Sequence, residues 1–479
     1  MSPPGYRPGE DRLRVRRSYR NNCDGHRARQ RQNRRRNGGA NGHDRRIAHD
    51  LRHGESARQG NDDRRGRACF QGRRQVGRLA SSAVSELLAY EVALDKLLRL
   101  ATPLEDEEIA VTDAIGRYIV APLISQRVQP AADLSAMDGF AVADVNGKEW
   151  QVIGESRAGQ PYSGTVTSAQ AVLISTGAVV PAGTNAILVR EIVERTEGSI
   201  RLSGDLPEPR DRHIRRRGGD FSKGETIAEE GSEVTPRLLA LALTAGVTRV
   251  TVKRRPRLAI IQSGDELYDP MQEPVSTESH RLPAANGLML KAMFAPHLVE
   301  ASLQPLLPDD PDRLAEEFAK LHDHDIIVTI GGASVGEHDH VGQAFEQIGA
   351  DLKFGKVAIK PGKPVMVARR AKQLIVGLPG NPVSAFVTAM LFVRPLLLHL
   401  AGAEDVEFKP VSMPLGAALP AGGDRREFLR AVEKDGKLYA LTEQGSGALH
   451  SLAEAQYLID RPIDDEPRGI GDSVAAYRL

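Results

Sequence analysis

The stretch DIIVTIGGASVGEHD, residues 325–339, decides the fold of the central part of this chain. Its apolar half, residues 326–330, predicts a buried strand, and a glycine-rich turn at residues 331–336 follows directly. Glycine removes the penalty on positive φ and lets backbone N–H groups come close to an anion such as phosphate. The carboxylates of Glu337 and Asp339 would repel that anion unless a cation lay between them. The stretch therefore indicates a phosphorylated ligand with a divalent cation or, taken alone, an ordinary loop after a strand.

The sequence around this stretch alternates between predicted strands and predicted helices. Strands are predicted at residues 258–261, 298–303, 326–330, 365–368 and 374–376, and helices at residues 286–294, 311–322, 341–348 and 383–400. This alternation favours a doubly wound, mostly parallel sheet with helices on both faces. Ligands of such sheets bind beyond the carboxyl ends of the strands. We therefore expect a central α/β domain over residues 257–406, with its site at that edge of the sheet.

Acidic residues follow three of the predicted strands, at Glu266, Asp309 and Asp339. Carboxylate oxygens are ligands that Mg²⁺ prefers, so the three acids together predict a magnesium site. Asp309 also has a purely structural interpretation, because Asp309 and Asp310 stand before Pro311 in a pattern that starts helices.

Lysines and a rigid loop occupy the other strand ends. Lys356, Lys360 and Lys363 can neutralise an oxyanion, or they can form a solvated face. The Pro-Gly-Asn-Pro loop at residues 379–382 can border a ligand, or it can be only a rigid turn. Because such features follow several strands of one predicted sheet, we expect them to gather at one edge and to form a ligand site.

The rest of the chain predicts smaller modules. Short strand-like runs at residues 151–153, 171–174 and 186–189 are broken by Gly and Pro, which is typical of a small all-β domain. Helices are predicted on either side of it, one capped by Ser82 and running to Leu98, with Leu87 and Leu88 in its apolar stripe, and one at residues 236–245. The last part of the chain again predicts a small β domain.

The composition excludes several classes of protein. Hydrophobic residues make up 41% of the chain and charged residues 27%, which is ordinary for a soluble globular protein. The longest apolar run, about residues 385–400, is interrupted by Arg394, and the N-terminus lacks the apolar core of a signal peptide. We therefore expect a cytoplasmic protein with no membrane partner.

Residues 1–80 differ from the rest of the chain. They hold about 22 arginines, no lysine and about 8 acidic residues, with almost no apolar periodicity, which predicts a disordered tail. Such an arm can bind nucleic acid, although the lack of lysine and of interleaved aromatic residues argues against that partner. A translated upstream region or a mis-assigned start is an equally good interpretation. Both cysteines, Cys23 and Cys69, lie in this tail, so the remaining residues offer no thiol for a disulfide, a zinc site or covalent catalysis.

Longer motifs occur in order along the chain. They are SAMDGFA at residues 135–141, IRRRGGD at 214–220, SGDEL at 263–267, GGASVGEHD at 331–339, IKPGKP at 359–364 and GLPGNPVSA at 377–385. In this combination the chain resembles the MoeA family of molybdopterin molybdenumtransferases, also found as the C-terminal domain of gephyrin-like proteins. The resemblance covers about residues 82–479 and leaves the basic tail without a counterpart.

The resemblance implies a reaction, an assembly and a division into domains. The family inserts molybdate into adenylylated molybdopterin with Mg²⁺ and releases AMP. It acts as a homodimer, in which Asp138 and Thr176 would complete the site of the partner chain, and other proteins of the cofactor pathway are expected as transfer partners. The implied domains are a discontinuous linker and dimerisation domain at residues 81–123 and 214–256, a small β domain at 124–213, an α/β domain resembling molybdopterin adenylyltransferase at 257–406, and a C-terminal β domain at 407–479.

The resemblance also implies roles for single residues. Those implied to be catalytic are Asp138, Thr176, Glu266, Asp309 and Asp339, and the last three are implied to hold the metal. The residues implied or expected to bind substrate are Gly331, Gly332, Ser334, Gly336, Lys356, Lys360, Lys363, Pro379, Asn381, Pro382, Arg430 and Ser446. Which acid binds Mg²⁺ and which faces molybdate stays open.

One departure and two alternatives accompany the resemblance. The chain reads Ala284-Ala285-Asn286 where family members commonly carry Asp-Ser-Asn or Asp-Thr-Asn, so we expect one ligand contact to be missing. A related molybdopterin adenylyltransferase would carry out the preceding step from ATP, but the extra domains and the SAMDGFA motif argue against it. A gephyrin-like scaffold would bind a protein partner, but the retained acids and lysines argue against a scaffold alone.

Overall fold

The computed structural model describes residues 87–273, 280–294, 296–332 and 340–479. The predictions made for Ser334, Gly336, Asp339 and the tail at residues 1–80 lie outside the described residues.

The central α/β part is built on one mixed sheet with the strand order β16-β13-β17-β21-β20-β18. The parallel strands are β16 (Glu300–Leu303), β13 (Arg257–Gln262), β17 (Ile326–Ile330) and β21 (Gln373–Leu378). Strands β20 (Met366–Arg370) and β18 (Asp351–Phe354) each run antiparallel to the neighbour they extend. Only two residues connect β20 to β21, and so short a connection can join only antiparallel strands. The predicted α/β class is confirmed.

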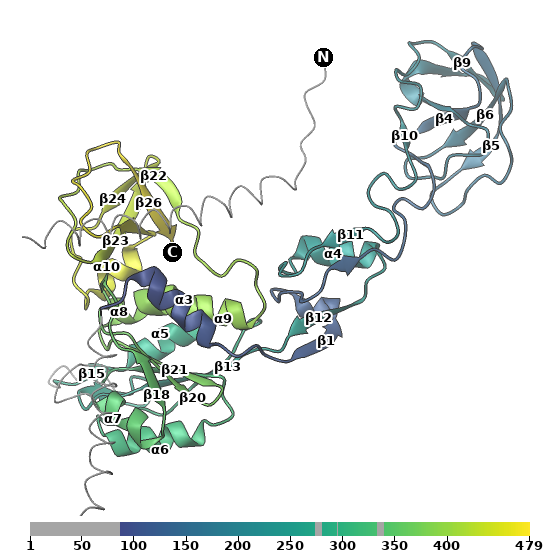
Figure 1. Cartoon of the computed structure of the whole chain (residues 1–479). Helices are drawn as coiled ribbons and strands as arrows, with labels where there is room; N and C mark the ends of the chain where they lie inside the picture. The colour runs from purple at the N-terminus through teal and green to yellow at the C-terminus, as the bar shows by residue number, and fades with distance from the viewer. Residues whose placement is uncertain (1–86, 274–279, 295, 333–339) are drawn as a thin grey trace, which may run out of the picture. The chain divides into compact units, whose positions relative to one another are not determined.

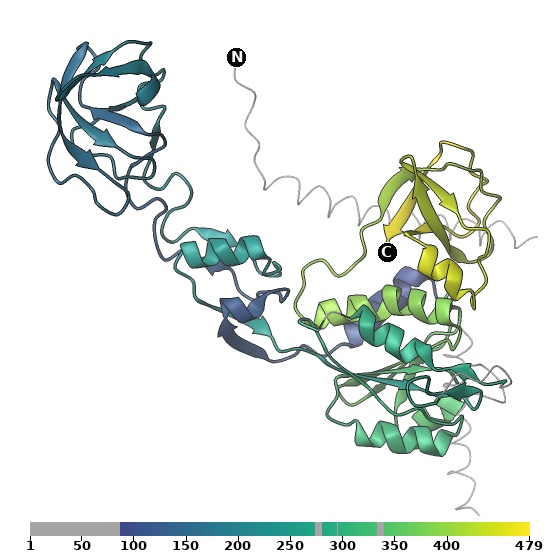
Figure 2. The same ribbon diagram turned by 180° about the vertical axis from the view of Figure 1, so that it is seen from behind.

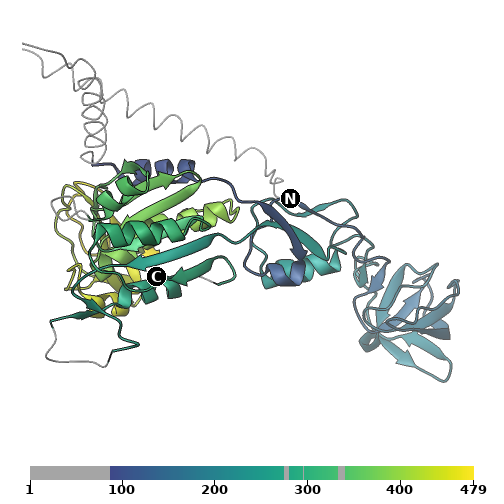
Figure 3. The same ribbon diagram turned by 90° about the horizontal axis from the view of Figure 1, so that it is seen from below.

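Helices cover both faces of this sheet (Figure 1, Figure 3). Alternate residues of β13 point to opposite faces, because side chains in a strand alternate. Leu258 and Ile260 belong to the core with α5 (Ala285–Met293), and Ala259 and Ile261 to the core with α6 (Pro311–Lys320) and α7 (His340–Gln347). Each layer therefore has an apolar core of its own.

The helix predicted at residues 383–400 is interrupted. Helices α8 (Pro382–Thr388) and α9 (Arg394–Leu400) are joined by a π-helical turn at Ala389–Val393. Pro395 has no N–H to donate to the carbonyl of Leu391 and its ring crowds that carbonyl, which widens the preceding turn. The Tyr90 hydroxyl donates to the Leu391 carbonyl instead, at 3.5 Å. Within the described residues this run is also the one segment long and apolar enough to span a membrane, and 83% of it is buried inside the protein, as in a core helix.

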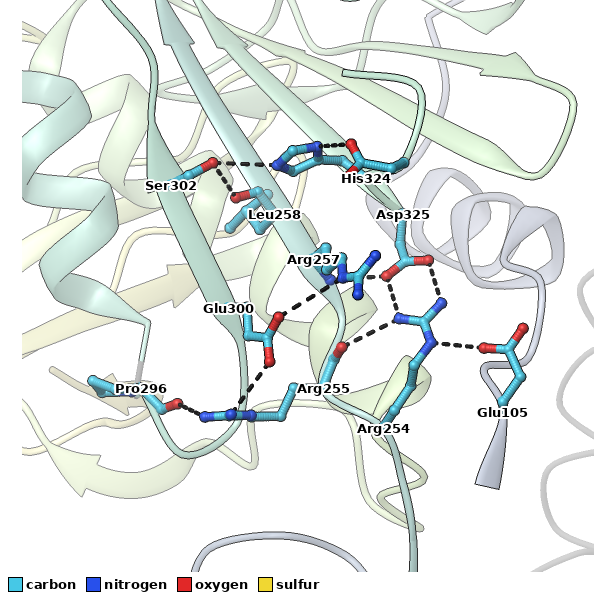
Figure 4. A network of polar contacts seen from close by, with 11 residues as sticks. Glu105, Arg254, Arg255, Arg257, Leu258, Pro296, Glu300, Ser302, His324 and Asp325 are labelled. Atoms are coloured by element: carbon cyan, nitrogen blue, oxygen red, sulfur yellow. Dashed lines mark hydrogen bonds and ion pairs between the residues drawn. The ribbon is translucent and has the colours of Figure 1, made fainter. Parts of the chain in front are cut away.

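Charged residues join the opposite, amino end of the sheet to the segments before it (Figure 4). The Asp325 carboxylate accepts two hydrogen bonds from the Arg254 guanidinium, at 2.7 and 2.8 Å, and one from the Arg257 N–H at 2.8 Å. Arg254 also donates to Glu105 at 2.6 Å. These contacts raise the pKa of Arg254, with the hydrogen bond to Asp325 as the largest cause that favours its charged form. They tie the start of β17 to the chain that enters β13.

A separate small β sheet has the strand order β7-β4-β6-β5-β9-β8 (Figure 2). Its strands are β4 (Gly139–Val142), β5 (Glu149–Ser156), β6 (Gln170–Ile174), β7 (Ala186–Val189), β8 (Val193–Arg195) and β9 (Ser199–Leu202). Phe140, Trp150, Leu188 and Ile200 form the centre of its core. The small β module predicted from residues 151–153, 171–174 and 186–189 is therefore present.

The segments before and after this sheet pair with each other. Strand β1 (Asp106–Ala110) is antiparallel to β12 (Arg249–Lys253), β2 (Leu123–Ile124) to β11 (Thr226–Ala228), and β3 (Leu134–Ser135) to β10 (Ile214–Arg215). Helix α4 (Pro236–Thr244) packs nearby, and the Thr235 hydroxyl caps it by accepting from the Leu238 N–H at 3.2 Å. The small sheet is thus an insertion between two chain segments that fold together.

The C-terminal part forms a sheet with the order β19-β23-β25-β26-β22, with β24 on β23. Its strands are β22 (Val411–Pro414), β23 (Arg426–Lys434), β24 (Lys437–Ala440), β25 (Tyr457–Arg461) and β26 (Ser473–Arg478), with helix α10 at Leu449–Glu454. Strand β19 (Ile359–Lys360) comes from the α/β segment and pairs in parallel with β23. Helix α3 (Tyr90–Leu100) packs Leu94 and Leu97 into the core beside α9. The prediction that this helix includes Leu87 and Leu88 is wrong, because the Leu88 N–H donates to the Lys356 carbonyl oxygen at 3.1 Å and the helix begins after it. A strand of one predicted domain therefore completes the sheet of the next.

Candidate functional site

A cavity of about 270 Å³ opens where β13, β17 and β21 end. Of the predicted site residues, those that line it are Glu266, Asp309, Gly331, Gly332, Pro379 and Asn381. Six further lining residues were not among the predicted site residues: Gln262, Ser263, Leu267, Ile330, Pro364 and Gly380. We expected strand-end residues to gather at one edge of the sheet. Glu266, Asp309, the two glycines and the loop at residues 379–381 do line one cavity there.

The glycine turn needs glycine for two reasons. Gly331 and Gly332 have φ values of +99° and +61°, where side-chain-bearing residues are strained. A Cβ on Gly331 would also lie 2.4 Å from the Ser263 carbonyl oxygen, well inside van der Waals contact. The end of β17 can therefore lie directly against the end of β13, with backbone rather than side chains facing the cavity.

Two adjacent acids before α6, Asp309 and Asp310, have different hydrogen-bond partners. Helix α6 is capped by Asp310, whose carboxylate accepts from the N–H groups of Asp312 at 2.8 Å and Arg313 at 3.2 Å. The helix-start interpretation therefore applies to Asp310, and the Asp309 side chain does not cap the helix. The Asp309 Oδ1 atom is buried and has no hydrogen-bond partner among the described residues. Asp309 is therefore available to a ligand or a cation.

The donor set fits a hard cation. Glu266 and Asp309, two residues with carboxylate oxygens, line the cavity, and Mg²⁺ prefers oxygen ligands. Asp339, the third predicted ligand, lies outside the described residues. Within the residues that the structure describes, no group of three or more His, Cys, Asp or Glu side chains is arranged to hold a metal.

The Pro-Gly-Asn-Pro loop is held in place by the first turn of α5. The Asn286 Nδ2 donates to the Gly380 carbonyl oxygen at 2.7 Å, and the Gly287 N–H donates to the Gln262 Oε1 at 2.9 Å. Ala284 stands at the N-cap of this helix without a side chain that could bond to its free N–H groups. The departure at residues 284–285 thus removes polar groups, and the retained Asn286 fastens the loop. A buried Asn after two alanines was the signal that could have predicted this contact.

The predicted lysines do not line the cavity. Lys360 lies on β19, and its Nζ pairs with the Glu427 Oε1 at 2.9 Å. The Glu427 side chain is only 12% exposed, so Lys360 neutralises a carboxylate that is largely shielded from water. Lys363 contributes its carbonyl oxygen to a hydrogen bond from the Val357 N–H at 2.9 Å. The ammonium groups of Lys356 and Lys363 make no ion pair with the described residues.

Arg430, Ser446 and Pro382 lie where the C-terminal part meets α8. The Arg430 side chain is buried, and its guanidinium donates to the Ser451 Oγ at 3.0 Å and the Glu443 carbonyl oxygen at 2.9 Å. Burial lowers the pKa of Arg430. The Ser446 carbonyl oxygen accepts from the Val383 N–H at 3.0 Å, next to Pro382 in the first turn of α8. These contacts hold the loop at residues 443–446 against the start of α8.

Asp138, just before β4, and Thr176, just after β6, lie together at one end of the small β sheet and do not line the cavity. The Asp138 Oδ1 accepts from the Thr176 N–H at 2.7 Å and from the Thr176 hydroxyl at 2.9 Å. The backbone hydrogen bond, followed by the hydroxyl one, lowers the pKa of Asp138 and keeps it ionised. Both residues are exposed, so the carboxylate is fixed in direction while it faces solvent.

Three protein-family models match successive parts of this chain. The model of the MoeA N-terminal region (domain I and II) matches residues 88–246, that of a probable molybdopterin binding domain matches residues 259–399, and that of the MoeA C-terminal region (domain IV) matches residues 412–479. The molybdopterin molybdenumtransferase of Haemophilus influenzae is 32% identical over 372 residues, covering 76% of this chain and 89% of the relative. That of Synechococcus elongatus is 31% identical over 415 residues, covering 84% of this chain and all of the relative.

A solved structure has the same fold. The crystal structure of the molybdopterin biosynthesis moeA protein from Pyrococcus horikoshii OT3 aligns with 82% of this chain and 100% of its own, at 27% identity and a TM-score of 0.70.

Proposed function

Because the chain belongs to the MoeA family of molybdopterin molybdenumtransferases, enzymes of molybdenum cofactor biosynthesis, we propose that it inserts molybdate into adenylylated molybdopterin and releases AMP. The observation that carries the proposed site is the unpartnered Asp309 Oδ1, buried in the cavity that the glycine turn also lines. A buried carboxylate oxygen without a hydrogen bond is costly, and a bound cation would remove that cost. Mg²⁺ is the cation we propose.

The proposed reaction asks for little covalent chemistry from the protein. Molybdopterin supplies the two dithiolene sulfurs that bind molybdenum, and no cysteine occurs after Cys69. Water cleaves the phosphoanhydride of the adenylylated pterin to the pterin phosphate and AMP, and the oxide that molybdate loses to the two sulfurs leaves with two protons as water. The protein is then required to bind anions, to orient the phosphoanhydride and to hold a cation beside it.

Residues at the edge of the sheet would share these tasks. Glu266 and Asp309, with Asp339 beyond the described residues, would hold Mg²⁺, which when bound would polarise the phosphoanhydride. The backbone at Gly331 and Gly332 would approach a phosphate, and the ends of β13 and β21 would border the pterin.

Residues outside the cavity are assigned to the anion and to the partner chain. We assign molybdate to the neighbourhood of Lys356, Lys360 and Lys363, because these charges can gather an oxyanion. In a homodimer, Asp138 and Thr176 would complete the site of the other chain, since their fixed carboxylate faces solvent.

Molybdate-dependent release of AMP tests the proposal. The full chain is incubated with adenylylated molybdopterin and Mg²⁺, with and without molybdate, and AMP is measured by chromatography. We expect AMP and active cofactor only when molybdate and Mg²⁺ are both present. The Asp309→Asn variant should lose most of this activity while remaining folded.

A surface variant gives the matched control. Asp424 has a side chain that is 92% exposed, so Asp424→Asn should behave as the wild type does. Conversion of molybdopterin and ATP to the adenylylated pterin by the wild type, without molybdate-dependent AMP release, would assign the chain to the preceding step instead. Full activity of Asp309→Asn would remove the acid from the proposed site.

A further inference from the structure

Two buried hydroxyl groups of the α/β part have no hydrogen-bond partner among the described residues. They are the Oγ of Ser263, whose residue is 3% exposed, and the Oγ1 of Thr329, whose residue is 0% exposed. A buried hydroxyl without a partner loses its hydrogen bonds to water and gains nothing in return. Only Ser263 lines the cavity, while Thr329 points into the interior beside β21.

Ser263 lines the cavity directly after the end of β13. Its N–H donates to the Ile330 carbonyl oxygen at 3.1 Å, which fixes the end of β13 against the end of β17. Its Oγ would be 3.5 Å from a Cβ on Gly331 and 3.7 Å from one on Gly332, so the missing side chains of both glycines leave room at this hydroxyl. The backbone of Ser263 is therefore fixed, and its buried hydroxyl lies next to two positions that carry no side chain.

Other free groups line the same cavity. Among the described residues, nothing accepts a hydrogen bond from the N–H of Gly332 or of Gly380. The Asp309 Oδ1, a buried acceptor without a donor, belongs to another residue that lines this cavity. A ligand that presents anionic oxygens to the hydroxyl and the N–H groups, and a cation to Asp309, would satisfy all of them at once.

We propose that the Ser263 hydroxyl donates a hydrogen bond to an anionic phosphate oxygen of the ligand bound in this cavity. This inference rests on the proposed function, and it adds a direct ligand contact at a residue outside the predicted set. Ser263 thereby adds a side-chain hydrogen bond to the phosphate. The glycine turn offers the phosphate only backbone N–H groups. Neither a metal ligand nor a proton transfer is assigned to it.

Binding titrations with the Ser263→Ala variant test the inference. The full chain and the variant are titrated anaerobically, once with molybdopterin, which carries a phosphate monoester, and once with AMP, and binding is followed by calorimetry. A hydrogen bond to a charged group predicts a loss of affinity of about ten- to a hundredfold for the ligand whose phosphate contacts Ser263. A loss for molybdopterin, for AMP or for both supports the inference and shows which phosphate is contacted.

The other unpartnered hydroxyl provides the matched control. Thr329→Val removes a buried hydroxyl of the same kind outside the cavity, so its ligand affinity should equal that of the wild type. Both variants should be at least as stable as the wild type in thermal denaturation, because neither loses a hydrogen bond in the ligand-free protein. That result separates a ligand contact from a structural one.

The outcomes that would overturn the inference are distinct. Unchanged affinity of Ser263→Ala for both ligands, with a wild type that binds them, would overturn the contact at Ser263 and leave the proposed function in place. A wild type that binds neither ligand and shows no molybdate-dependent AMP release would overturn the proposed function, and the inference with it. A lowered Tm for Ser263→Ala with unchanged affinity would assign the hydroxyl a structural role.

Discussion

The Asn286 amide donates a hydrogen bond to the Gly380 carbonyl oxygen, at 2.7 Å and across 94 positions of the chain. This bond connects the first turn of α5 with the loop that precedes α8, and that loop lines the cavity. Asn286 is 9% exposed, so the bond is shielded from water. The position of the loop therefore depends on one amide group from the segment that otherwise departs from the family pattern.

Asn286→Ala should weaken the site more than the fold. Loss of this hydrogen bond is expected to lower the free energy of unfolding by about 1 kcal/mol. The loop at residues 379–382 should then lose its fixed position, and the rate of AMP release should fall about tenfold or more. Urea denaturation and the AMP assay measure the two effects, and Asn146→Ala, at an exposed position, serves as the control. Wild-type AMP release by Asn286→Ala would show that the loop needs no such tie.

Gly331→Ala should be far more damaging than the same change at Gly349. Both glycines have positive φ, +99° and +68°, so both substitutions strain the backbone, by about 1 kcal/mol for the second. Only Gly331 has an atom in the way, the Ser263 carbonyl oxygen at 2.4 Å, while nothing lies within 4 Å at Gly349. We expect Gly349→Ala to retain wild-type AMP release and Gly331→Ala to lose it. Equal effects of the two variants would mean that close approach at the turn has no role.

Asp325→Ala should lower stability without changing the chemistry. The Asp325 side chain is 17% exposed and that of Arg254 29%, so a partly buried guanidinium would lose its bidentate partner, at a cost of about 2 kcal/mol. Glu105 would remain as a partial substitute. The network lies at the amino end of β17 and the cavity at its carboxyl end, so activity per folded molecule should stay at the wild-type value.

The control for this change is a surface pair. Asp351 is 72% exposed and pairs with Lys353, so Asp351→Ala should alter stability by less than about 0.5 kcal/mol in the same urea titration. Similar losses in the two variants would contradict the structural role given to Asp325.

Thr176→Val should raise the pKa of Asp138. The wild-type carboxylate accepts hydrogen bonds from the N–H and the hydroxyl of Thr176, and both lower its pKa, the N–H more strongly. A group whose pKa is lowered on folding adds stability above its ordinary pKa, about 3.9, and loses it as the pH falls through the folded value. The variant keeps the hydrogen bond from the Thr176 N–H and loses the one from the hydroxyl. The pKa of Asp138 in the variant should therefore lie between its value in the wild type and the ordinary value of an Asp. Carboxyl resonances followed by NMR from pH 6 to about 2 measure it, and an unchanged value would contradict the role of the hydroxyl.

Changes at the Lys360–Glu427 pair should move molybdate affinity in opposite directions. Lys360→Ala removes the positive charge and should weaken binding, while Glu427→Gln keeps a hydrogen-bond acceptor and removes the opposing charge. The second variant should bind molybdate about threefold more tightly at low ionic strength, and the gain should shrink in salt. Asp405→Asn, in the exposed pair with Lys409, is the control and should change nothing. Molybdate titrations of the three variants and the wild type test this prediction. Identical dissociation constants for all four proteins would mean that molybdate binds away from this pair.

Part of this molecule could be predicted because its physical cause is local. The apolar run at residues 326–330 predicts a buried strand and the two glycines predict a turn after it, and the structure has both. The alternation of strands and helices gave the α/β class for the same reason. The cavity at the strand ends follows from that topology.

Other features depend on contacts between distant residues, which no local pattern contains. Pro395 itself predicts an interruption of the long helix, but the hydroxyl that donates to the Leu391 carbonyl comes from Tyr90, 301 positions away. Which of Asp309 and Asp310 caps α6 depends on where that helix begins, and either acid could have been its cap. Ser263 stands out only once its missing partner is seen, because a serine in a turn has no signature of its own.

The pairing of β19 with β23 limits how this chain can be divided. The stretch between α9 and β22 resembles a hinge between independent modules, at which a gene could be split or a fusion partner inserted. A split there would separate two strands of one sheet, and the Lys360 strand would go with one fragment while its neighbour went with the other. Each fragment would expose an unpaired strand edge, which invites aggregation. The two halves are therefore expected to be inherited, expressed and engineered as one piece.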